Sequence, residues 1–501
     1  MQEERSNHRN MSIDLSDIKN FQDATVTVMG LGRYKKGSGI GAAKWLMRHG
    51  AQLVITDLKD QEELRDSIDE IMHWYTEYRA QFTDRDIYQP VFVLGKHDAD
   101  NFTNVDLVVQ NPGVARESEF VTLAKGQGVA IESDISLFFR YCPFPIYSIT
   151  GTRGKSTTTA LLGEMLKHKY PKTVVAGNIT RSPLEDLDWL LEEKAPVPIV
   201  LELSSWLLES IEGLGLGPDI AILTNAYKDH LDRYPSFDAY IAAKELIFLE
   251  QKSDQVAILN YDQEIMHDIA GRIPSKHIHW FSASVLPEGV NGTYRDGDDL
   301  VRRIDGQFTN YAHVHDLKLQ GDHNLMNALS ASLAAHLAGV SDEDIHASLK
   351  TFAGLPGRQE ILGEVEGVLF VNDTTGTSPE GVMAALKRFG KGGNIVLICG
   401  GSSKGLSFIE LGKMIGEQCK YVVIFEGDAA NDIDSAIGDG APSVRVESME
   451  QAVKVANENA KLGDVILLSP GTSSFGMFKN EFDRGDQFKA QFEKLGGKQV
   501  G

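Results

Sequence analysis

Short apolar runs alternate with amphipathic stretches along most of the chain. Near the start, residues 25–29 have the pattern of a buried strand, and the glycine-rich segment GLGRYKKGSGIG at 30–41 follows it. A helix-like run at 42–50 then leads into a second strand at 51–57, which ends at Asp57. This order predicts a βαβ unit, and the apolar segments VFVLG and VDLVVQNPG continue the pattern of a parallel sheet.

The same alternation begins again after the segment SDISLFFRY at 133–141. PIYSITGTRGKSTTT at 145–159 has the pattern of a strand, a loop and the start of a helix, and a third cycle follows GLPGR at 354–358. In this third cycle, four apolar strands alternate with helix-like segments, at 368–373, 394–401, 421–427 and 465–471. A Gly- and Asp-rich stretch at 287–299 is expected to form an exposed hairpin or insertion.

These cycles predict an α/β fold with three domains, which agrees with a length of 501 residues. We expect a Rossmann-like N-terminal domain at 1–138, beginning with a polar tail at 1–20, a central domain with a mostly parallel sheet at 139–354, and a Rossmann-like C-terminal domain at 355–501.

Composition and charge narrow the possible partners. Apolar residues make up 42% and charged residues 24%, which is ordinary for a globular protein and excludes collagen-like and mostly disordered classes. The 49 Lys and Arg against 71 Asp and Glu give a formal charge of −22. Such a surface disfavours nucleic acids and anionic membranes, but a local site can still hold a small phosphorylated ligand.

Three widely spaced cysteines, Cys142, Cys399 and Cys419, show no CxxC spacing and suggest neither a disulfide framework nor a zinc site. We expect them to be small buried hydrophobes. The first dozen residues are polar, and no run of about 18 apolar residues is present for membrane insertion. A cytoplasmic, reducing environment and a monomer are expected.

The strongest local signal is the loop Gly151-Thr152-Arg153-Gly154-Lys155-Ser156-Thr157. It lies between a predicted strand and a predicted helix, so its backbone N–H groups, the helix N-terminus and Lys155 are expected to hold the phosphates of a nucleoside triphosphate, with Ser156 on magnesium. The central domain is therefore predicted to be of the P-loop ATPase type. Because Ile149 stands where the full GxxxxGK[ST] pattern has its first Gly, that pattern is incomplete, and a plain strand-to-helix turn remains an alternative.

Three further segments carry polar residues next to apolar strands. Glu202 ends the run VLE, where a divalent cation or a salt bridge would compensate its burial. His230 follows an apolar strand and is either a ligand or a structural residue. Asn324 and Asn327 begin an alanine-rich helix, where contact with adenine and helix capping are equally good explanations.

Taken in order, these segments resemble the Mur ligases. The similar motifs are the phosphate loop at 151–157, ELSS at 202–205, DHLDRYP at 229–235 with a downstream AAK at 242–244, HNLMNA at 323–328, GLPGR at 354–358, NDT at 372–374, and SPGTSSFGMFKNEFDRG at 469–485. Together they span roughly residues 26 to 488. Within the family, the resemblance implies an ATP-dependent amide ligase of peptidoglycan precursor synthesis that adds glutamate, in its D form, to UDP-N-acetylmuramoyl-L-alanine.

The resemblance also implies roles in the ATP and metal sites. Lys155 and Ser156 would hold phosphates and one Mg²⁺ shared with Glu202, and His230 would ligate a second Mg²⁺. Lys244 matches a lysine that CO₂ converts to a carbamate, a negatively charged group suited to stabilising that second metal site. Asn324 and Asn327 match positions near adenine, Arg358 matches a phosphate contact, and Asp373 matches a carboxylate near the ribose.

The substrate residues follow from the same resemblance. Ser38 and Gly39 match positions at the diphosphate and Asp57 one near uridine, while Asn111 and Asn178 are also matched to the uridine-nucleotide site. An apparent insertion at 33–36 makes the positions in this loop uncertain, and Lys35 and Lys36 there either touch the diphosphate or are solvated. Thr377, Lys404, Ser474 and Phe475 match positions that hold glutamate.

Two departures from the family pattern concern the amino-acid site. Thr375 stands where lysine is common, and Glu481 stands where an aromatic residue is common, with Phe482 next to it. The residues alone therefore leave the stereochemistry of glutamate open.

The implied chemistry explains why cations are needed. The alanyl carboxylate attacks the γ-phosphorus of ATP and forms an acyl phosphate as ADP leaves, and the glutamate amine then displaces phosphate from the acyl carbon. Two anions meet in the first step, so Lys155, Arg358 and Mg²⁺ would lower their repulsion. Since Lys155 and Arg358 lie in different predicted domains, closure about a hinge at 353–356 is expected.

Three other functions compete with this one. A folylpolyglutamate synthase shares the ATP chemistry but does not need a uridine-nucleotide domain of over a hundred residues. A nicotinamide-dependent dehydrogenase fits Gly30, Gly32 and Asp57 but leaves the phosphate loop unexplained. A non-catalytic nucleotide-binding regulator would be expected to lack metal or phosphate residues, and all of them are present.

Overall fold

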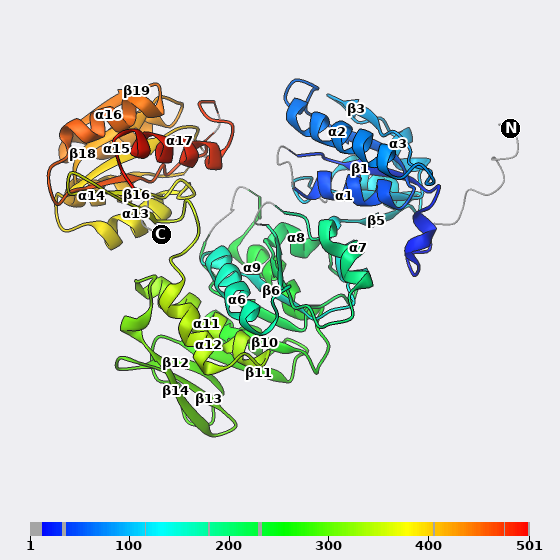
Figure 1. Cartoon of the computed structure of the whole chain (residues 1–501), viewed down its shortest axis with the longest axis horizontal. Coiled ribbons are helices and arrows are strands. Elements are labelled where there is room, and N and C mark those ends of the chain that lie inside the picture. Colours follow the sequence, from blue (N-terminus) through cyan, green and yellow to red (C-terminus); the bar gives the residue numbers. More distant parts are fainter. Residues whose placement is uncertain are drawn as a thin grey trace, which may run out of the picture. The chain divides into compact units, whose positions relative to one another are not determined.

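A computed structural model describes residues 13–32, 37–115, 117–178, 181–228, 233–403, 406–474 and 476–498. The chain divides into two compact units, Met1–Phe352 and Ala353–Gly501. Three separate sheets, two in the first unit and one in the second, are consistent with the predicted three-domain α/β architecture (Figure 1).

The first sheet has five parallel strands in the order β3-β2-β1-β4-β5. Its strands are β1 (Thr25–Met29), β2 (Gln52–Asp57), β3 (Val91–Leu94), β4 (Leu107–Gln110) and β5 (Ala130–Glu132). A 3-10 turn (Ile18–Phe21) precedes the sheet, and its helices are α1 (Ser38–Arg48), α2 (Arg65–Gln81), α3 (Asp100–Thr103), α4 (Glu119–Gly126) and α5 (Asp134–Tyr141). The strand order reverses between β1 and β4, which is where such sheets bind ligands.

Both faces of this sheet are buried, as its continuous apolar strands predict. Leu107 and Val109 of β4 pack into one core with Trp45 of α1, whereas Val108 between them packs into a second core with Phe102 of α3. The predicted boundary between 138 and 139 lies inside α5 and remains a prediction.

The second sheet has nine strands in the order β14-β13-β12-β11-β10-β9-β6-β8-β7. They are β6 (Ile146–Thr150), β7 (Val174–Gly177), β8 (Ile199–Glu202), β9 (Ile220–Leu223), β10 (Val256–Asn260), β11 (His277–Ser282), β12 (Gly292–Asp296), β13 (Asp299–Ile304) and β14 (Gln307–His313). All pairs from β7 to β12 are parallel, and β13 and β14 are antiparallel additions.

Helices and one short 3-10 turn connect the strands of the second sheet. They are α6 (Lys155–Lys169), α7 (Leu184–Glu192), α8 (Ser205–Glu209), α9 (Phe237–Leu249), α10 (Glu264–Ala270), the 3-10 turn Val314–Asp316, α11 (Asp322–Leu337) and α12 (Asp342–Thr351). Among the described residues, none of the helices combines the length and apolar character needed to cross a bilayer.

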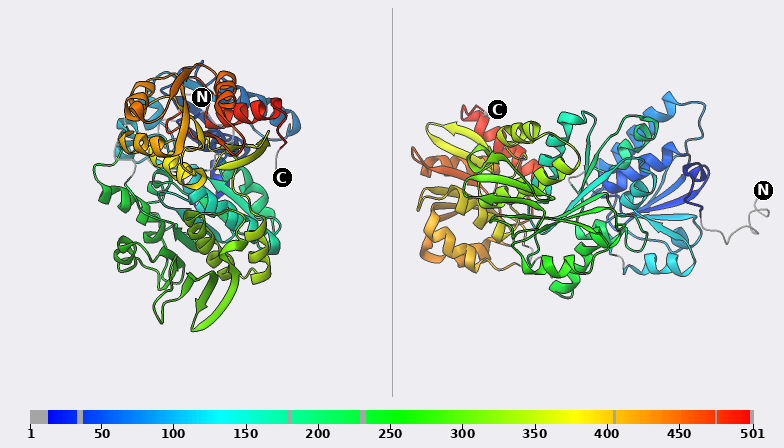
Figure 2. Two further views of the ribbon diagram at one scale, coloured as in Figure 1. Left: turned by 90° about the vertical axis from the view of Figure 1, so that its left-hand side faces the viewer. Right: turned by 90° about the horizontal axis from the view of Figure 1, so that it is seen from below.

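The stretch at 287–299 corrects one expectation. It does contribute to a hairpin, β12–β13, whose continuation into β14 extends beyond the helices in Figure 1 and in the left panel of Figure 2. However, Gly292, Thr293 and Tyr294 are buried because β12 pairs with β11 and extends the sheet. The prediction that this stretch is exposed is therefore wrong for the first half of β12.

The third sheet has six strands in the order β15-β16-β20-β17-β18-β19. They are β15 (Glu360–Val365), β16 (Val368–Asn372), β17 (Ile395–Gly400), β18 (Cys419–Phe425), β19 (Ser443–Val446) and β20 (Val465–Leu468). The helical segments are α13 (Pro379–Phe389), α14 (Ile409–Gln418), α15 (Ala430–Ile437), the 3-10 turn Gly438–Gly440, α16 (Met449–Asn459) and α17 (Glu481–Lys494).

Four of these six strands match the apolar runs in the sequence. The pattern misses β15, which is the antiparallel edge strand, and β19, whose alternating polar residues face solvent. All three cysteines are free, with Cys399 and Cys419 buried and Cys142 half-buried.

In the first unit, the cores of the two sheets are continuous. One hydrophobic cluster contains Val28 of β1 and Trp45 of α1 together with Leu187 of α7 and Leu201 of β8. Next to it, Asp188 of α7 forms ion pairs with Arg48 and His49 at the end of α1.

Close approach of α1 to the loop after β1 requires glycine at position 39. A Cβ atom at Gly39 would lie 2.4 Å from the carbonyl oxygen of Leu31 and 2.6 Å from that of Gly30, and these backbone atoms cannot move away without shifting the loop. At Gly126, the last residue of α4, a Cβ atom would meet nothing within 4 Å.

We predict that Gly39→Ala destabilises the first unit by about 1–3 kcal/mol, because the added methyl group overpacks this contact. Gly126→Ala is the matched control, and it should be neutral or stabilising by up to about 1 kcal/mol, as expected for Ala over Gly in a helix. Urea unfolding followed by circular dichroism measures both. Equal effects of the two substitutions would contradict the steric explanation.

Candidate functional site

Three parallel strands end next to one another at the centre of the second sheet. β6 pairs with β8 on one side and β9 on the other, with Ile149 opposite Glu202 and Thr150 opposite Leu223. The loop at 151–154, Glu202 and Thr224 therefore lie at the same edge of the sheet, where parallel sheets place their ligand sites.

The loop at 151–154 follows β6 directly and leads into α6. Gly154 is its N-cap residue and has a left-handed backbone with φ 81°, and Gly151 has φ 143°. A Cβ atom at Gly151 would lie 2.0 Å from Oγ1 of Thr224, and one at Gly154 would lie 2.2 Å from Oδ1 of Asn327. The loop thus fits between the end of β9 and helix α11, which favours the phosphate-loop interpretation over a plain turn.

The loop is also fixed by hydrogen bonds to the segment after β9. The backbone N–H of Thr152 donates to the carbonyl oxygen of Asn225 at 3.0 Å, and that of Arg153 donates to Oδ1 of Asn225 at 2.8 Å. Nζ of Lys155 donates to the carbonyl oxygens of Gly151 and Thr152, at 2.9 and 3.0 Å.

Two hydroxyl residues follow Lys155 in the first turn of α6. Ser156 is buried and Thr157 is half-buried. The loop and the N-terminus of the helix therefore place a cation, hydroxyl groups and backbone amides at one point, which is the chemistry that a polyphosphate needs.

Glu202 is a buried carboxylate with one oxygen left over. Its side chain is in β8 and is only 1% exposed. Nδ2 of Asn178 donates to Oε1 at 2.9 Å, whereas Oε2 has no hydrogen-bond partner within the part of the chain that the structure describes. Since an uncompensated buried charge is costly, this oxygen fits a divalent cation, and the salt bridge considered as an alternative is not observed there.

Lys244 reaches the same loop from α9. It is 2% exposed, Nζ donates to the carbonyl oxygen of Gly151 at 3.0 Å, and it lies 4.5 Å from the centre of the Tyr240 ring. Lys155 and Lys244 therefore share one backbone acceptor. His230 lies outside the described residues, so its predicted role as a ligand remains a prediction.

Asn324 and Asn327 lie on the side of α11 that faces α6. Oδ1 of Asn327 accepts from Thr158, its Nδ2 donates to Oδ1 of Asn324 at 3.3 Å, and Nδ2 of Asn324 donates to the carbonyl oxygen of Gln320. The N-cap residue of α11 is Gly321, without a side-chain cap, so neither asparagine caps the helix.

An apolar pocket lies next to these asparagines. Asn324 and Thr157 line it together with the following apolar residues: Leu161, Leu317, Leu319, Ala328, Leu349 and Phe352. An amide beside apolar walls suits a flat heteroaromatic ring.

The predicted uridine-nucleotide residues lie mainly at the first sheet. Ser38 begins α1, Gly39 packs against the loop after β1, and Asn111 follows β4 across the switch point. Asp57 ends β2, where its two carboxylate oxygens accept from the backbone N–H groups of Leu31 and Lys59.

Asn178 lies at the second sheet, whereas the other predicted nucleotide residues lie at the first. It follows β7 in the second sheet, where its side chain holds Glu202 as described above. The structure thus separates Asn178 from the other four residues and brings it to the phosphate loop. The insertion at 33–36 lies outside the described residues.

The remaining predicted residues, which are expected to contact ATP or to hold glutamate, belong to the second unit. Arg358 is exposed, Thr377 is half-buried and Ser474 is buried. Lys404 and Phe475 lie outside the described residues.

Asp373 is the most perturbed acid in this unit. Its side chain is 5% exposed and accepts from the backbone N–H of Gln359 at 3.0 Å and from the hydroxyl of Ser469 at 2.7 Å. Burial raises its pKa to about 7, against the hydrogen bonds and the charge of Arg358, which lower it.

Sequence reasoning gave no role to Arg484, although it lies in one of the quoted motifs. It is fully buried in α17, where it donates from Nε to Oγ1 of Thr374 and from Nη2 to the carbonyl oxygen of Thr374. Thr375, one of the two departures, donates to the carbonyl oxygen of Gly357 at 3.0 Å. Arg484 thus fixes the end of the strand that carries Asp373. The one signal of this role in the sequence is that an arginine stands on an apolar helix face.

Comparisons with known proteins agree with this arrangement. Residues 149–335 match the Mur ligase middle domain, and residues 357–471 match the Mur ligase glutamate ligase domain. The UDP-N-acetylmuramoylalanine–D-glutamate ligase of Roseiflexus sp. (strain RS-1) is 40% identical over 481 residues, which covers 93% of this chain and 98% of the relative. The ligase of the same name from Desulfitobacterium hafniense is 34% identical and covers 94% and 97% of the two chains.

The fold is shared with more distant solved structures. The UDP-N-acetylmuramate–alanine ligase of Thermotoga maritima aligns with a TM-score of 0.58 at 20% identity, over 94% of this chain and 99% of that one. The two matched domains and the full-length relatives together fix the assignment: the chain belongs to the Mur ligase family of ATP-dependent ligases that form amide bonds.

Proposed function

We propose that this protein joins D-glutamate to UDP-N-acetylmuramoyl-L-alanine in the synthesis of the peptidoglycan precursor. The observation that carries the proposal is the full-length similarity to relatives of that name, 40% over 93% of the chain. Because the similarity includes the N-terminal sheet, it favours a uridine-nucleotide substrate over the folate substrate of a folylpolyglutamate synthase. A dehydrogenase is not supported, since the matched domains are ligase domains.

ATP would bind at the loop after β6. We propose that the amides at 151–154, with Lys155, Ser156 and Thr157, hold its phosphates, and that adenine enters the apolar pocket beside Asn324, with Asn327 behind it. The contacts of Asn327 with Thr158 support this, because they tie the pocket wall to the phosphate-binding helix.

A magnesium ion fits the donors at this edge of the sheet. Glu202 has a buried oxygen without a hydrogen-bond partner within the described residues, and Ser156 is buried in the first turn of α6, which follows β6 at the same edge of the sheet. We propose that these two residues hold Mg²⁺, which would neutralise charge on the phosphates. A second site, with His230 and a carbamylated Lys244, is part of the same proposal.

The reaction needs two anions to approach each other. The alanyl carboxylate oxygen bonds to the γ-phosphorus as the bond from phosphorus to the β,γ-bridging oxygen breaks and ADP leaves. The amine of glutamate then bonds to the acyl carbon, loses a proton, and phosphate leaves with the electrons of the C–O bond. Lys155 lies at the loop, and its ammonium group would stabilise the charge that develops on the transferred phosphoryl group.

The remaining residues complete the proposal. We propose that Ser38, Gly39, Asp57, Asn111 and Asn178 bind the uridine nucleotide, that Asn178 also orients Glu202, and that Arg358 and Asp373 contact ATP. We further propose that Thr377, Lys404, Ser474 and Phe475 hold glutamate. The predicted monomer remains a prediction.

An ADP-release assay tests the proposed function. With ATP and Mg²⁺, release should require both UDP-N-acetylmuramoyl-L-alanine and D-glutamate, and L-glutamate or a folate with glutamate should not substitute. Lys155→Ala should lower the rate by about 10²-fold or more, because it removes preorganised charge, while the melting temperature stays within a few degrees. Lys167→Ala is the control on the same helix, since Lys167 is exposed and pairs with Glu164.

Two results would contradict the proposed function. One is ADP release that depends on the folate and not on the muramoyl nucleotide, which would move the protein to a folylpolyglutamate synthase activity. The other is an undiminished rate for Lys155→Ala, which would remove the loop from the chemistry.

Carbamylation of Lys244 is tested separately. If the ammonium group of Lys244 loses one proton, and the resulting neutral amine attacks CO₂ and releases a second proton, protein equilibrated with ¹³C-bicarbonate should show a single carbamate carbon resonance, and Lys244→Arg should lack it. Arg keeps the positive charge but does not form the carbamate, so this variant should also lose most ligase activity. A signal that persists in Lys244→Arg would assign the carbamate to another lysine.

Asp373 gives a pH dependence of stability. In the folded protein the pKa of Asp373 is raised from 3.8 to about 7, so the folded state keeps a proton that the unfolded state releases above about pH 4. The contribution of Asp373 to the free energy of unfolding is therefore fully present below about pH 4 and is lost as the pH rises to about 7. Compared with Asp373→Asn, wild-type protein should therefore lose about 1.4 kcal/mol per pH unit between pH 4 and 7 and level off above. Chemical unfolding of both proteins across this range measures the difference, and a constant difference would rule out the raised pKa.

A further inference from the structure

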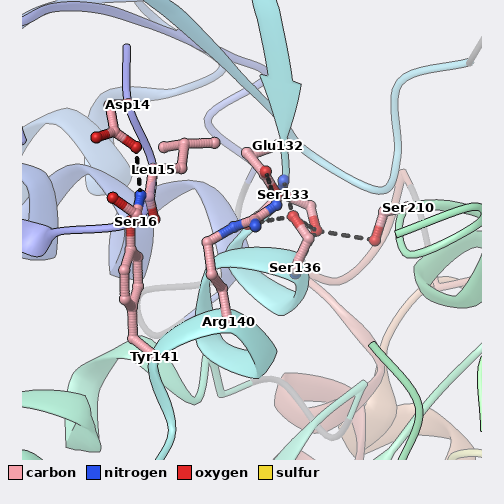
Figure 3. Close-up of polar contacts among 9 residues, drawn as sticks. All are labelled: Asp14, Leu15, Ser16, Glu132, Ser133, Ser136, Arg140, Tyr141 and Ser210. Atoms are coloured by element: carbon pink, nitrogen blue, oxygen red, sulfur yellow. Dashed lines mark hydrogen bonds and ion pairs between the residues drawn. The ribbon is translucent and has the colours of Figure 1, made fainter. Parts of the chain in front are cut away.

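Helix α5 follows the last strand of the first sheet, and its polar contacts reach elements of both sheets in the first unit. The hydroxyl of Ser133, its N-cap residue, donates to Oγ of Ser210 just after α8, at 2.8 Å (Figure 3). Arg140 at the other end of α5 pairs with Glu132 of β5 at 2.6 Å, which holds the helix against its own sheet. The helix is therefore attached to both sheets of the first unit.

Asp134, the first residue of α5, makes a second connection of this kind. Its side chain is 1% exposed, and Oδ2 accepts a hydrogen bond from the hydroxyl of Ser182 at 2.7 Å. The hydroxyl of Ser38, at the start of α1, helps to lower the pKa of the same carboxyl group. Oδ1 has no partner at hydrogen-bond distance in the described part of the chain.

The two serines lead to different ligand sites. Ser38 begins the helix that we propose to bind the diphosphate. Ser182 lies four residues after Asn178, which holds Glu202, and directly before α7. The approach is close, because a Cβ atom at Gly41 of α1 would lie 2.4 Å from Cβ of Ser182. Asp134 thus joins the predicted nucleotide-binding helix to the segment behind the metal site.

Among the described residues, the cations on the elements around Asp134 pair with other acids. On α1, Lys44 pairs with Glu70; on the segment before α7, Arg181 pairs with Asp186 and Glu185; on α5, Arg140 pairs with Glu132. Asp186 and Asp188 of α7 are the acids on that side, and they pair with Arg181 and with Arg48 and His49. Burial accordingly raises the pKa of Asp134, and hydrogen bonds from Ser182 and Ser38 offset this only in part.

We propose that Asp134 is a positioning residue that fixes the start of α1 against Ser182 and thereby sets the affinity for the uridine-nucleotide substrate. It does not touch the reacting atoms. This inference rests on the proposed function, since it assumes a diphosphate at the N-terminus of α1.

The charge of Asp134 gives the proposal a specific signature. In its neutral form the side chain orders the two serines without placing a negative charge beside the diphosphate. When rising pH ionises it, repulsion should weaken nucleotide binding. The KM of the wild type for the nucleotide should therefore rise toward high pH relative to that of Asp134→Asn, which keeps the shape and stays neutral.

Steady-state kinetics on the full-length enzyme test this with three variants. Asp134→Ala should raise the KM for UDP-N-acetylmuramoyl-L-alanine by about tenfold or more, with kcat and the KM for ATP within about threefold. Asp134→Asn should restore the KM at neutral pH to within about threefold. Asp188→Asn is the control, because it weakens the partly buried ion pairs between α1 and α7 without touching Asp134, and it should leave the KM unchanged.

The outcomes separate the possibilities. An unchanged nucleotide KM in Asp134→Ala, or an equal rise in Asp188→Asn, would overturn the proposal, the latter because docking of α1 alone would then explain the affinity. If Asp134→Ala does not fold, Ser182→Ala removes the hydrogen-bond donor instead, and it should raise the same KM by several-fold; no rise would overturn the proposal. Wild-type turnover of the muramoyl nucleotide, measured first, shows whether the proposed function itself holds.

Discussion

The parallel register of β6 between β8 and β9 is the constraint on which the site depends. It aligns the ends of three strands, at Thr150, Glu202 and Leu223, so that the loop at 151–154, Glu202 and Thr224 meet at one edge. Because side chains alternate between the two faces of a strand, a slip of one residue in β8 would turn Glu202 to the opposite face. The rest of the site, from the glycines of the loop to Lys244, is fitted around this alignment.

The same edge concentrates charge before any ligand arrives. One backbone oxygen, that of Gly151, accepts from both Lys155 and Lys244, while Glu202 is held by the neutral amide of Asn178 and keeps one oxygen available. A loop fixed by these hydrogen bonds and an oriented acid need little reorganisation when phosphates and a metal enter. It also explains why the glycines are required, since a side chain at either one would displace Thr224 or Asn327.

Local sequence patterns were sufficient for the fold class and for the position of the phosphate loop. Apolar strands followed by glycine turns are encoded within about ten residues, so β6, β8 and the start of α6 were predicted from their own composition. Contacts between distant segments were not predictable in this way. The resemblance assigns Asn178 to the nucleotide, which remains a prediction, but local patterns do not indicate its hydrogen bond to Glu202. The hydrogen bond from Ser182 to Asp134 likewise joins residues 48 positions apart. Edge strands such as β15 were missed because half of their residues face solvent.

The hydrophobic cluster that the first two sheets have in common affects how the protein folds during its synthesis on the ribosome. Trp45 of α1 is covered by residues of α7, including Leu187, which leaves the ribosome roughly 140 residues later. At translation rates of about 5–20 residues per second, that face of the nascent N-terminal sheet stays uncovered for on the order of ten seconds. The third sheet has cores that contain only residues of the second unit, so its burial is completed within that unit. Vectorial synthesis therefore makes the first domain, although it emerges earliest, dependent on the second for its native burial.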